Sequence, residues 1–148
     1  MKKSKMELTY YLSAKVIQRS ECMGKNVIVA WGCYCQGTHF DVTHLRSNQE
    51  EADTKIILHA VDAASRIATE ITNNSPDTDV FVLSLRKYPQ LCSDAQFVTG
   101  TGERHQVINL KHVVQAHGST KVAALPGLHA LSGADITGSF AGKGKANF

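Results

Sequence analysis

The sequence predicts an α/β fold built around one sheet, and three observations lead to this prediction. A capping box at Ser47 and Glu50 is followed by apolar residues at helical spacing, which predicts an amphipathic helix over about 49–65. The run 26–32 is apolar, β-branched and flanked by glycine, which predicts a strand buried on both faces. Helical and strand patterns alternate along the rest of the chain, which is typical of this fold class.

The residues before the long helix are expected to form a helix and one or two strands. A capping box of Ser4 and Glu7, followed by apolar residues on one helical face, predicts a helix over about 5–19. The strand 26–32 comes next. Residues 33–47 are irregular in pattern, with room for one short strand at 40–44.

The middle of the chain contains two ambiguous segments. Residues 67–72 extend the helical pattern but also alternate as a strand does, and we favour a short strand. Residues 75–79 have the composition of a turn. The apolar run 80–83 fits a strand or a buried helix equally well. Residues 96–99 and 105–110 predict a β-hairpin around a glycine-rich turn.

The last third is expected to be helical and then glycine-rich. Its patterns predict helices over about 111–116, ending at Gly118, and over about 120–131, with Ser119 as N-cap and a kink at Pro126. Residues 132–148 contain no closing element, which suggests a truncated piece of a longer product. Because we find neither a repeat nor a linker, we expect residues 1–148 to form a single domain.

The composition is that of an ordinary soluble domain, with 43% hydrophobic residues, 20% charged residues and only 3 prolines. No apolar run approaches the ~20 residues needed to cross a bilayer, and the basic start lacks the apolar core of a secretion signal. Four cysteines in a chain of this size favour reduced thiols. We therefore expect an intracellular protein, nuclear or cytoplasmic, that does not bind membranes.

Charge is distributed unevenly along the chain. Residues 1–40 carry 6 Lys or Arg against 2 Asp or Glu, residues 41–85 carry 3 against 8, and residues 86–148 carry 7 against 3. An acidic centre suits a hard divalent cation and basic flanks suit phosphates, as in a metal-dependent enzyme that acts on nucleic acid. The alternative is a solvated acidic helix between basic surface segments.

Several carboxylates fall where a predicted element begins or ends, where ligands bind in α/β sheets: Glu51, Asp53, Asp77, Asp79 and Asp135. Glu51 and Asp53 point apart on a regular helix and share a site only if Glu51 precedes its first turn, whereas Glu50 and Asp53 are easier partners. Helix-dipole complementation and turn formation explain each of these residues singly.

The acidic motifs, taken in order, resemble those of a known family. They are Gln49-Glu-Glu-Ala-Asp-Thr54, Ser75-Pro-Asp-Thr-Asp79, and Leu131-Ser-Gly-Ala-Asp135 followed by Gly142-Lys-Gly-Lys145. This series resembles the internal nuclease region of the flap-endonuclease/XPG-like group in the PIN-like superfamily, over about residues 47–145. The segments Glu50-Glu-Ala-Asp-Thr-Lys55 and Ser75-Pro-Asp-Thr-Asp-Val-Phe81 also resemble PIN-like open reading frames associated with mobile elements in animal genomes.

The resemblance implies a three-layer sandwich with a mainly parallel central sheet, here truncated, and the start of a helix-two-turn-helix. It implies a nuclease that hydrolyses phosphodiester bonds of DNA or RNA with one or two Mg²⁺ or Mn²⁺ ions and no small-molecule cofactor. Asp77 and Asp79 would be catalytic. The metal ligands carried over from the family are Glu51, Asp53, Asp77, Asp79 and Asp135.

The same resemblance implies that Gly142, Lys143, Gly144 and Lys145 bind nucleic acid. The alternative interpretation of these four residues is a flexible basic terminus. The chain also departs from the family. The strand end Ala30-Trp31-Gly32 lacks the expected carboxylate, and Asp41 is the only spare acidic residue there, expected at the surface. No room exists for the family's basic arch between Gly32 and Gln49, and Asp53 replaces a longer Glu.

Two alternatives to an active nuclease follow from these departures and from the cysteines. One is a catalytically inert remnant that binds nucleic acid or another protein. The other is an interaction module stabilised by zinc at Cys33-x-Cys35 with His39 and His44, although the cysteine spacing is tighter than usual for zinc. Oligomeric state, DNA against RNA, and cleavage polarity are not encoded in these motifs.

Overall fold

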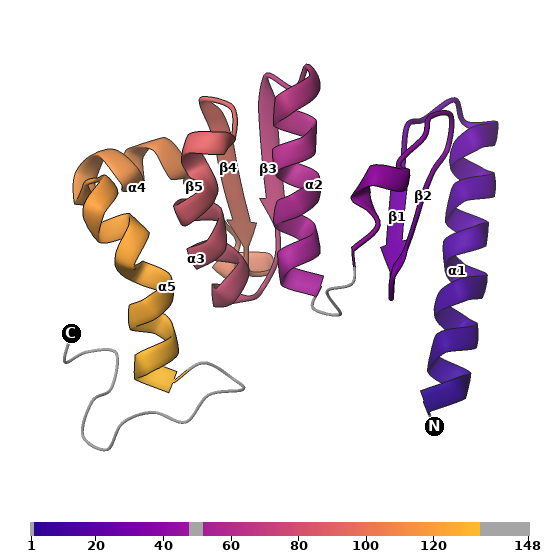
Figure 1. The fold of residues 1–148 in the computed structure, drawn as a ribbon, viewed down its shortest axis with the longest axis horizontal. Helices are drawn as coiled ribbons and strands as arrows, with labels where there is room; N and C mark the ends of the chain where they lie inside the picture. Colours follow the sequence, from indigo (N-terminus) through magenta and orange to yellow (C-terminus); the bar gives the residue numbers. More distant parts are fainter. Residues whose placement is uncertain (1, 48–51, 134–148) are drawn as a thin grey trace. The chain divides into compact units, whose positions relative to one another are not determined.

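The computed structural model describes residues 2–47 and 52–133, and these residues form five α-helices and five short strands (Figure 1). Contacts divide the chain into two compact units, Met1–Lys55 and Ile56–Phe148, with the boundary inside the helix Ala52–Arg66. The α/β class predicted from the sequence is confirmed. Within the described ranges, no helix is both long and apolar enough to span a membrane.

The first unit consists of helix α1 (Lys2–Cys22) and a hairpin of strands β1 (Ile28–Trp31) and β2 (Tyr34–Gly37). The two strands pair antiparallel and put Trp31 opposite Tyr34. Gly32 has a φ of 51° at the turn between them, a conformation that glycine adopts without strain. The predicted helix over 5–19 is confirmed and is longer at both ends.

Two predictions for this unit are wrong. The run 26–32 is not a strand buried on both faces, because β1 is only partly buried and has β2 as its one strand partner among the described residues. Residues 40–44 form no strand, since the backbone amide and hydroxyl of Thr43 both donate to the Asp41 carboxylate and a 3₁₀ turn follows at Thr43–Leu45. A small apolar cluster lies beneath this turn, made of Ile28, Cys35, Val42 and Leu45.

The second unit is built on a mixed three-stranded sheet in the order β3 (Glu70–Asn74), β4 (Asp94–Thr99), β5 (Gln106–Asn109). The first pair is parallel and the second is antiparallel, so the hairpin predicted around residues 100–105 is confirmed. The strand predicted at 67–72 is present but begins and ends slightly later.

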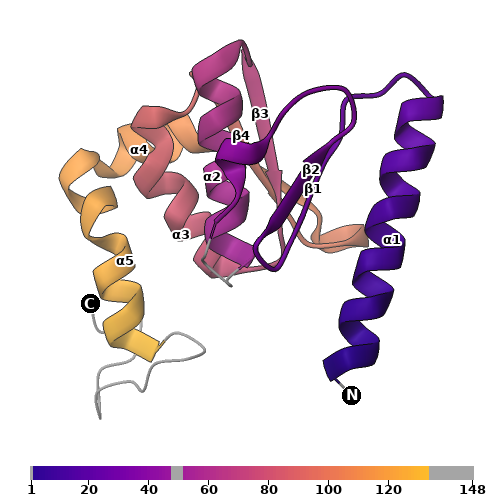
Figure 2. The same cartoon turned by 45° about the vertical axis from the view of Figure 1, so that its right-hand side comes forward.

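Helices α2 (Ala52–Arg66) and α3 (Thr78–Lys87) lie on the same side of this sheet (Figure 2). Alternate residues of β4, Ala95 and Phe97, are buried against them. The core is completed by helices α4 (Leu110–His117) and α5 (Ser119–Gly133), and its buried members are Ile57, Val80, Leu85, Ala95, Phe97, Leu110 and Val122.

Helix α3 resolves the ambiguity of the run 80–83, which is helical. A short apolar run can be buried in a helix or in a strand, so its composition alone does not distinguish the two. Here the N-cap at Asp77 starts a helix immediately before the run. The two C-terminal helices are confirmed, separated by Gly118 with a φ of 80°, and Pro126 lies inside α5. The predicted helix-two-turn-helix continues beyond residue 133 and lies outside the described residues.

Candidate metal centre

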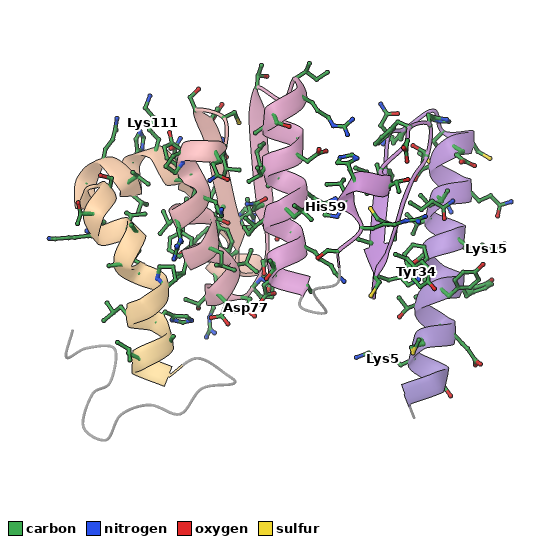
Figure 3. All side chains as sticks on the ribbon, viewed as in Figure 1. Lys5, Lys15, Tyr34, His59, Asp77 and Lys111 are labelled. Carbon is green, nitrogen blue, oxygen red and sulfur yellow. The ribbon has the colours of Figure 1, made fainter. Side chains whose placement is uncertain are left out.

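The loop from β3 to α3 carries the first two carboxylates of the site. Asp77, labelled in Figure 3, is the N-cap of α3 and has extended backbone angles. Its side-chain oxygen accepts a hydrogen bond from the backbone amide of Asp79 at 2.9 Å. The Asp77 amide in turn donates to the Ser75 hydroxyl at 3.1 Å. Residues 75–79, whose composition predicts a turn, therefore lead into the start of α3. Two hydrogen bonds, from Asp77 to Ser75 and from Asp79 to Asp77, fix the backbone there.

This loop is fixed to the sheet by buried polar contacts. The Ser75 amide donates to the carbonyl of Val98 on β4, at 3.1 Å. Beneath it, the Asn73 amide nitrogen donates to the Ser84 hydroxyl at 3.1 Å, and that hydroxyl donates to the Val80 carbonyl at 2.7 Å. Asn73 and Ser84 are both buried, so the contact joins the end of β3 to the inside of α3.

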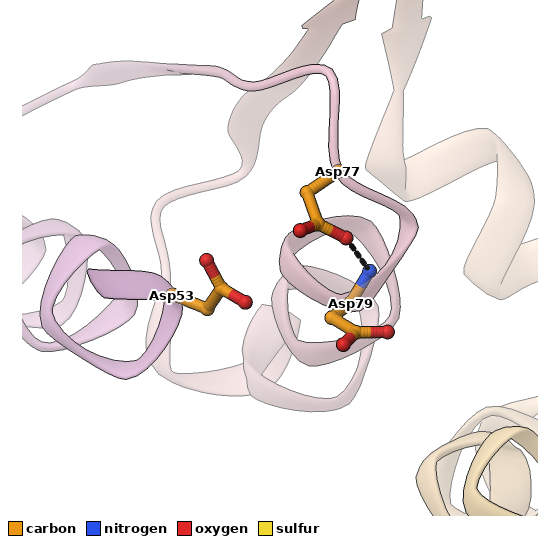
Figure 4. Close-up of side chains that lie close together, drawn as sticks. All are labelled: Asp53, Asp77 and Asp79. Carbon is orange, nitrogen blue, oxygen red and sulfur yellow. Dashed lines mark hydrogen bonds between the residues drawn. The ribbon is translucent and has the colours of Figure 1, made fainter. Parts of the chain in front are cut away.

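The third carboxylate comes from the start of α2. Asp53 lies in the first turn of that helix, whose Ile57 is part of the core of the second unit. In Figure 4 the carboxylates of Asp53 and Asp77 face each other, and Asp79 lies beside Asp77 with its carboxylate directed away from Asp53. One oxygen from each lies within 4.8 Å of the other two, and all three side chains are partly buried.

The position of the cluster follows from the topology. β3 and β4 are parallel, and Asp77 and Asp79 follow the carboxyl end of β3, the edge at which open α/β sheets bind ligands. Asp53 and Asp79 also occupy the first turns of two helices, where the helix dipole favours negative charge. Three carboxylates at this spacing repel one another, and a divalent cation between them would offset that repulsion.

His129 of α5 is the neighbour of the cluster that sequence reasoning missed. Its Nε2 contacts the Asp79 carboxylate, and its side chain is more buried than that of Asp79. The contact joins residues 50 positions apart in sequence, brought together because α5 packs on α3. No local motif marks His129, so only the packing of the two helices reveals it.

The structure brings together three of the five predicted metal ligands. Asp53, Asp77 and Asp79 form the cluster. The other two ligands, Glu51 and Asp135, lie outside the described residues, as do the predicted nucleic-acid contacts Gly142, Lys143, Gly144 and Lys145. The expected separation of Glu51 from Asp53 on the helix is therefore not tested.

The cysteine pair does not form a comparable group. Cys33 is exposed in the hairpin turn, whereas Cys35 is buried in the small cluster of the first unit. Among residues 2–47 and 52–133, the three aspartates are the only set of three metal-ligating side chains close enough to share an ion. Asp41 is exposed, as expected, and serves the turn at Thr43.

The geometry thus defines a carboxylate cluster at the carboxyl edge of a parallel strand pair, supported by buried hydrogen bonds and one histidine. No model of a known protein family matches the chain, and no curated protein or solved structure is significantly similar to it.

Proposed function

We propose that the protein is a divalent-metal-dependent nuclease that hydrolyses phosphodiester bonds of DNA or RNA. The observation that carries this proposal is the convergence of Asp53, Asp77 and Asp79, with oxygens within 4.8 Å of one another. The sequence resemblance to PIN-like nucleases implies metal binding by the same three residues.

The donor set fits Mg²⁺ or Mn²⁺. All three ligands are carboxylate oxygens, which hard cations prefer, and the partial burial leaves room for bound water. One Asp77 oxygen accepts the Asp79 amide, and the second oxygen would ligate the cation. When bound, the ion would lower the pKa of a coordinated water and stabilise the charge that develops on the phosphate.

The protein's own residues have separate tasks in this mechanism. Asp53 and Asp79 would hold the cation from two helix starts, and Asp77 would hold it while it caps α3. His129 would orient the Asp79 carboxylate, as second-layer partners of metal ligands do. The buried contact of Asn73 with Ser84 keeps the loop in place, so that the ligands need little rearrangement.

The PIN-like sandwich is part of the same proposal. Its mainly parallel sheet and third layer would require strands and helices in addition to the mixed sheet of the second unit. In that fold, Glu51 and Asp135 would complete the ligand set. The glycine and lysine residues of 142–145 would contact the substrate backbone.

A second candidate is a catalytically inert remnant that binds nucleic acid. The observation in its favour is that the strand end at Trp31 supplies no carboxylate and belongs to the separate β1–β2 sheet. This candidate predicts nucleic-acid binding without cleavage.

The test combines metal binding with cleavage. Calorimetry should show Mn²⁺ binding that is lost in Asp79→Asn and kept in the control Asp94→Asn. Asp94 begins β4 and so lies at the edge of the parallel strand pair opposite to the cluster. Labelled single-stranded, duplex and flap DNA and an RNA strand should be cut in Mn²⁺ or Mg²⁺ and left intact in EDTA. Cleavage that survives Asp77→Asn with Asp79→Asn would refute the proposed site, and metal binding without cleavage would favour the inert remnant.

A further inference from the structure

A cavity of about 690 Å³ lies between α1 and the β1–β2 hairpin of the first unit. Its volume is within the range of sites that bind small organic molecules. Three of the residues that line it are aromatic, Tyr10 of α1 with Trp31 and Tyr34 of the hairpin. Lys5 of α1 also lines the cavity, five residues before Tyr10. The cavity is remote in sequence from the carboxylates and shares no residue with them.

The three rings form a continuous aromatic wall. Trp31 and Tyr34 are stacked, with ring centroids 6.0 Å apart and an angle of 27° between their planes. Tyr10 meets Trp31 edge to face at 6.3 Å and 71°. The hairpin fixes this arrangement, because Trp31 and Tyr34 are cross-strand partners on either side of a tight turn.

Two of the three rings in this wall are largely exposed to solvent. Tyr10 is 66% exposed and Tyr34 is 63% exposed, so neither ring is needed to fill the interior of this unit. Large aromatic faces held rigidly at a surface cost little conformational entropy when they bind a flat ligand. Planar rings that stack on such faces are the ligands that this cavity suits.

The charge around the cavity specifies the ligand further. Among the described residues that line the cavity, Lys5 carries a positive charge and none is acidic. A flat heterocycle with an attached phosphate matches one stacking wall and one adjacent cation. Single-stranded nucleic acid presents such groups in series, whereas the bases of a duplex are already stacked on one another.

We propose that this cavity binds a base of single-stranded nucleic acid, with Tyr10, Trp31 and Tyr34 as the stacking wall and Lys5 on the neighbouring phosphate. The proposal deepens the proposed function, on which it rests for its meaning as substrate recognition. Its physical basis, the aromatic cavity, is independent of the carboxylates.

Trp31 gives a direct readout, since it is the only tryptophan in the chain. Its fluorescence should be quenched by single-stranded oligothymidine, as DNA and as the uridine RNA equivalent, roughly ten nucleotides long. Duplex DNA of the same length should quench it far less. Thymidine monophosphate tests whether a free nucleotide suffices, and we expect it to bind much more weakly than the strand. All titrations are made in EDTA, so that cleavage plays no part.

Matched variants identify the wall. Tyr34→Ala and Tyr10→Ala should weaken strand binding by roughly 5- to 100-fold, the effect of losing one base–aromatic stack. Tyr34→Phe keeps the ring and should keep the affinity. Tyr11→Ala is the control, because Tyr11 is exposed on the same helix but does not line the cavity. Lys5→Ala should lower the salt dependence of binding by about one ion.

Three outcomes would overturn the proposal. Equal binding by Tyr34→Ala and the unsubstituted chain would show that charge alone binds the strand. Quenching by mononucleotide as tight as by the strand would point to a free nucleotide. A change of Trp31 fluorescence with protein concentration, together with a dimer in light scattering, would show that a second copy fills the cavity. The proposed nuclease function fails separately, if strand binding is present but Mn²⁺ binding and cleavage are absent.

Discussion

Asp77 and Asp79 are joined by a hydrogen bond of 2.9 Å from the Asp79 amide to the Asp77 carboxylate. The bond makes Asp77 both the N-cap of α3 and a member of the carboxylate cluster. A cap needs only a side-chain oxygen, whereas a cation needs negative charge, so substitutions can separate the two roles.

Asp77→Asn should therefore keep the fold and weaken metal binding, because asparagine caps helices as well as aspartate does. Asp77→Ala should lose both, with a cost in the free energy of unfolding of about 1 kcal/mol. Chemical denaturation and Mn²⁺ calorimetry on the two variants measure the two roles. Equal destabilisation by Asn and Ala would contradict the capping role.

The buried contact between Asn73 and Ser84 should matter for stability. Ser84→Ala leaves the Asn73 amide without the hydroxyl that accepts from it, and an unsatisfied buried polar group costs about 1–3 kcal/mol. The midpoint of thermal unfolding should fall accordingly. Asn74→Ala, an exposed change next to Asn73 on the same strand, should have a much smaller effect. A fall of the same size in both variants would show that the buried contact is not the cause.

His129→Ala tests the contact between α5 and the cluster. If His129 orients Asp79, its removal should lower the affinity for Mn²⁺ by about 10- to 100-fold. His112→Ala, on the exposed surface of α4, is the control and should leave the affinity unchanged. Tighter Mn²⁺ binding by His129→Ala would show instead that the histidine competes with the cation for Asp79.

A bound cation should stabilise the folded protein. At a Mn²⁺ concentration of 100 times the dissociation constant, the gain in unfolding free energy is about 2.7 kcal/mol. The thermal midpoint should rise with Mn²⁺ and return with EDTA. Asp53→Asn should abolish the rise, and Asp94→Asn should preserve it. A rise that survives Asp53→Asn would exclude the cluster as its source.

Asp41 provides a test of pH dependence in the first unit. Hydrogen bonds from the Thr43 hydroxyl and amide hold the pKa of the Asp41 carboxyl below its usual value. Because the folded pKa is the lower one, the stabilisation is present above the unfolded pKa and is lost as pH falls through the folded pKa. Carbon NMR of the carboxyl should show this low pKa, and Thr43→Ala should raise it. An unchanged pKa in Thr43→Ala would show that the hydroxyl is not its cause.

The sequence predicted those elements whose information is local. The amphipathic pattern of 49–65, the glycine turn between β4 and β5, and Gly118 between the last helices each depend on neighbouring residues. The prediction for the run 26–32 was wrong because its outcome depends on pairing with another segment. Its apolar character is real, but only the turn at Gly32 and the pairing with β2 decide that it forms a hairpin strand rather than a central one.

In the candidate site, too, the residues that local sequence patterns mark could be predicted, and those that depend on tertiary packing could not. Asp77 and Asp79 are read from one turn and Asp53 from one helix start, so their positions at element ends could be inferred from the sequence. His129 could not, since its contact with Asp79 depends on how α5 packs on α3. The Asn73–Ser84 contact is likewise invisible, because both residues are ordinary polar residues until burial pairs them.

The length of the β3–α3–β4 connection leads us to expect an order in which the carboxylates come together during folding. The β4–β5 hairpin joins Thr99 to Gln106 across a short loop, whereas the parallel pair joins Glu70 to Asp94 across an entire helix. Closing the longer loop costs more chain entropy, so the hairpin is the easier first step. Asp77 and Asp79 lie within the longer connection, so we expect the cluster to form after the hairpin.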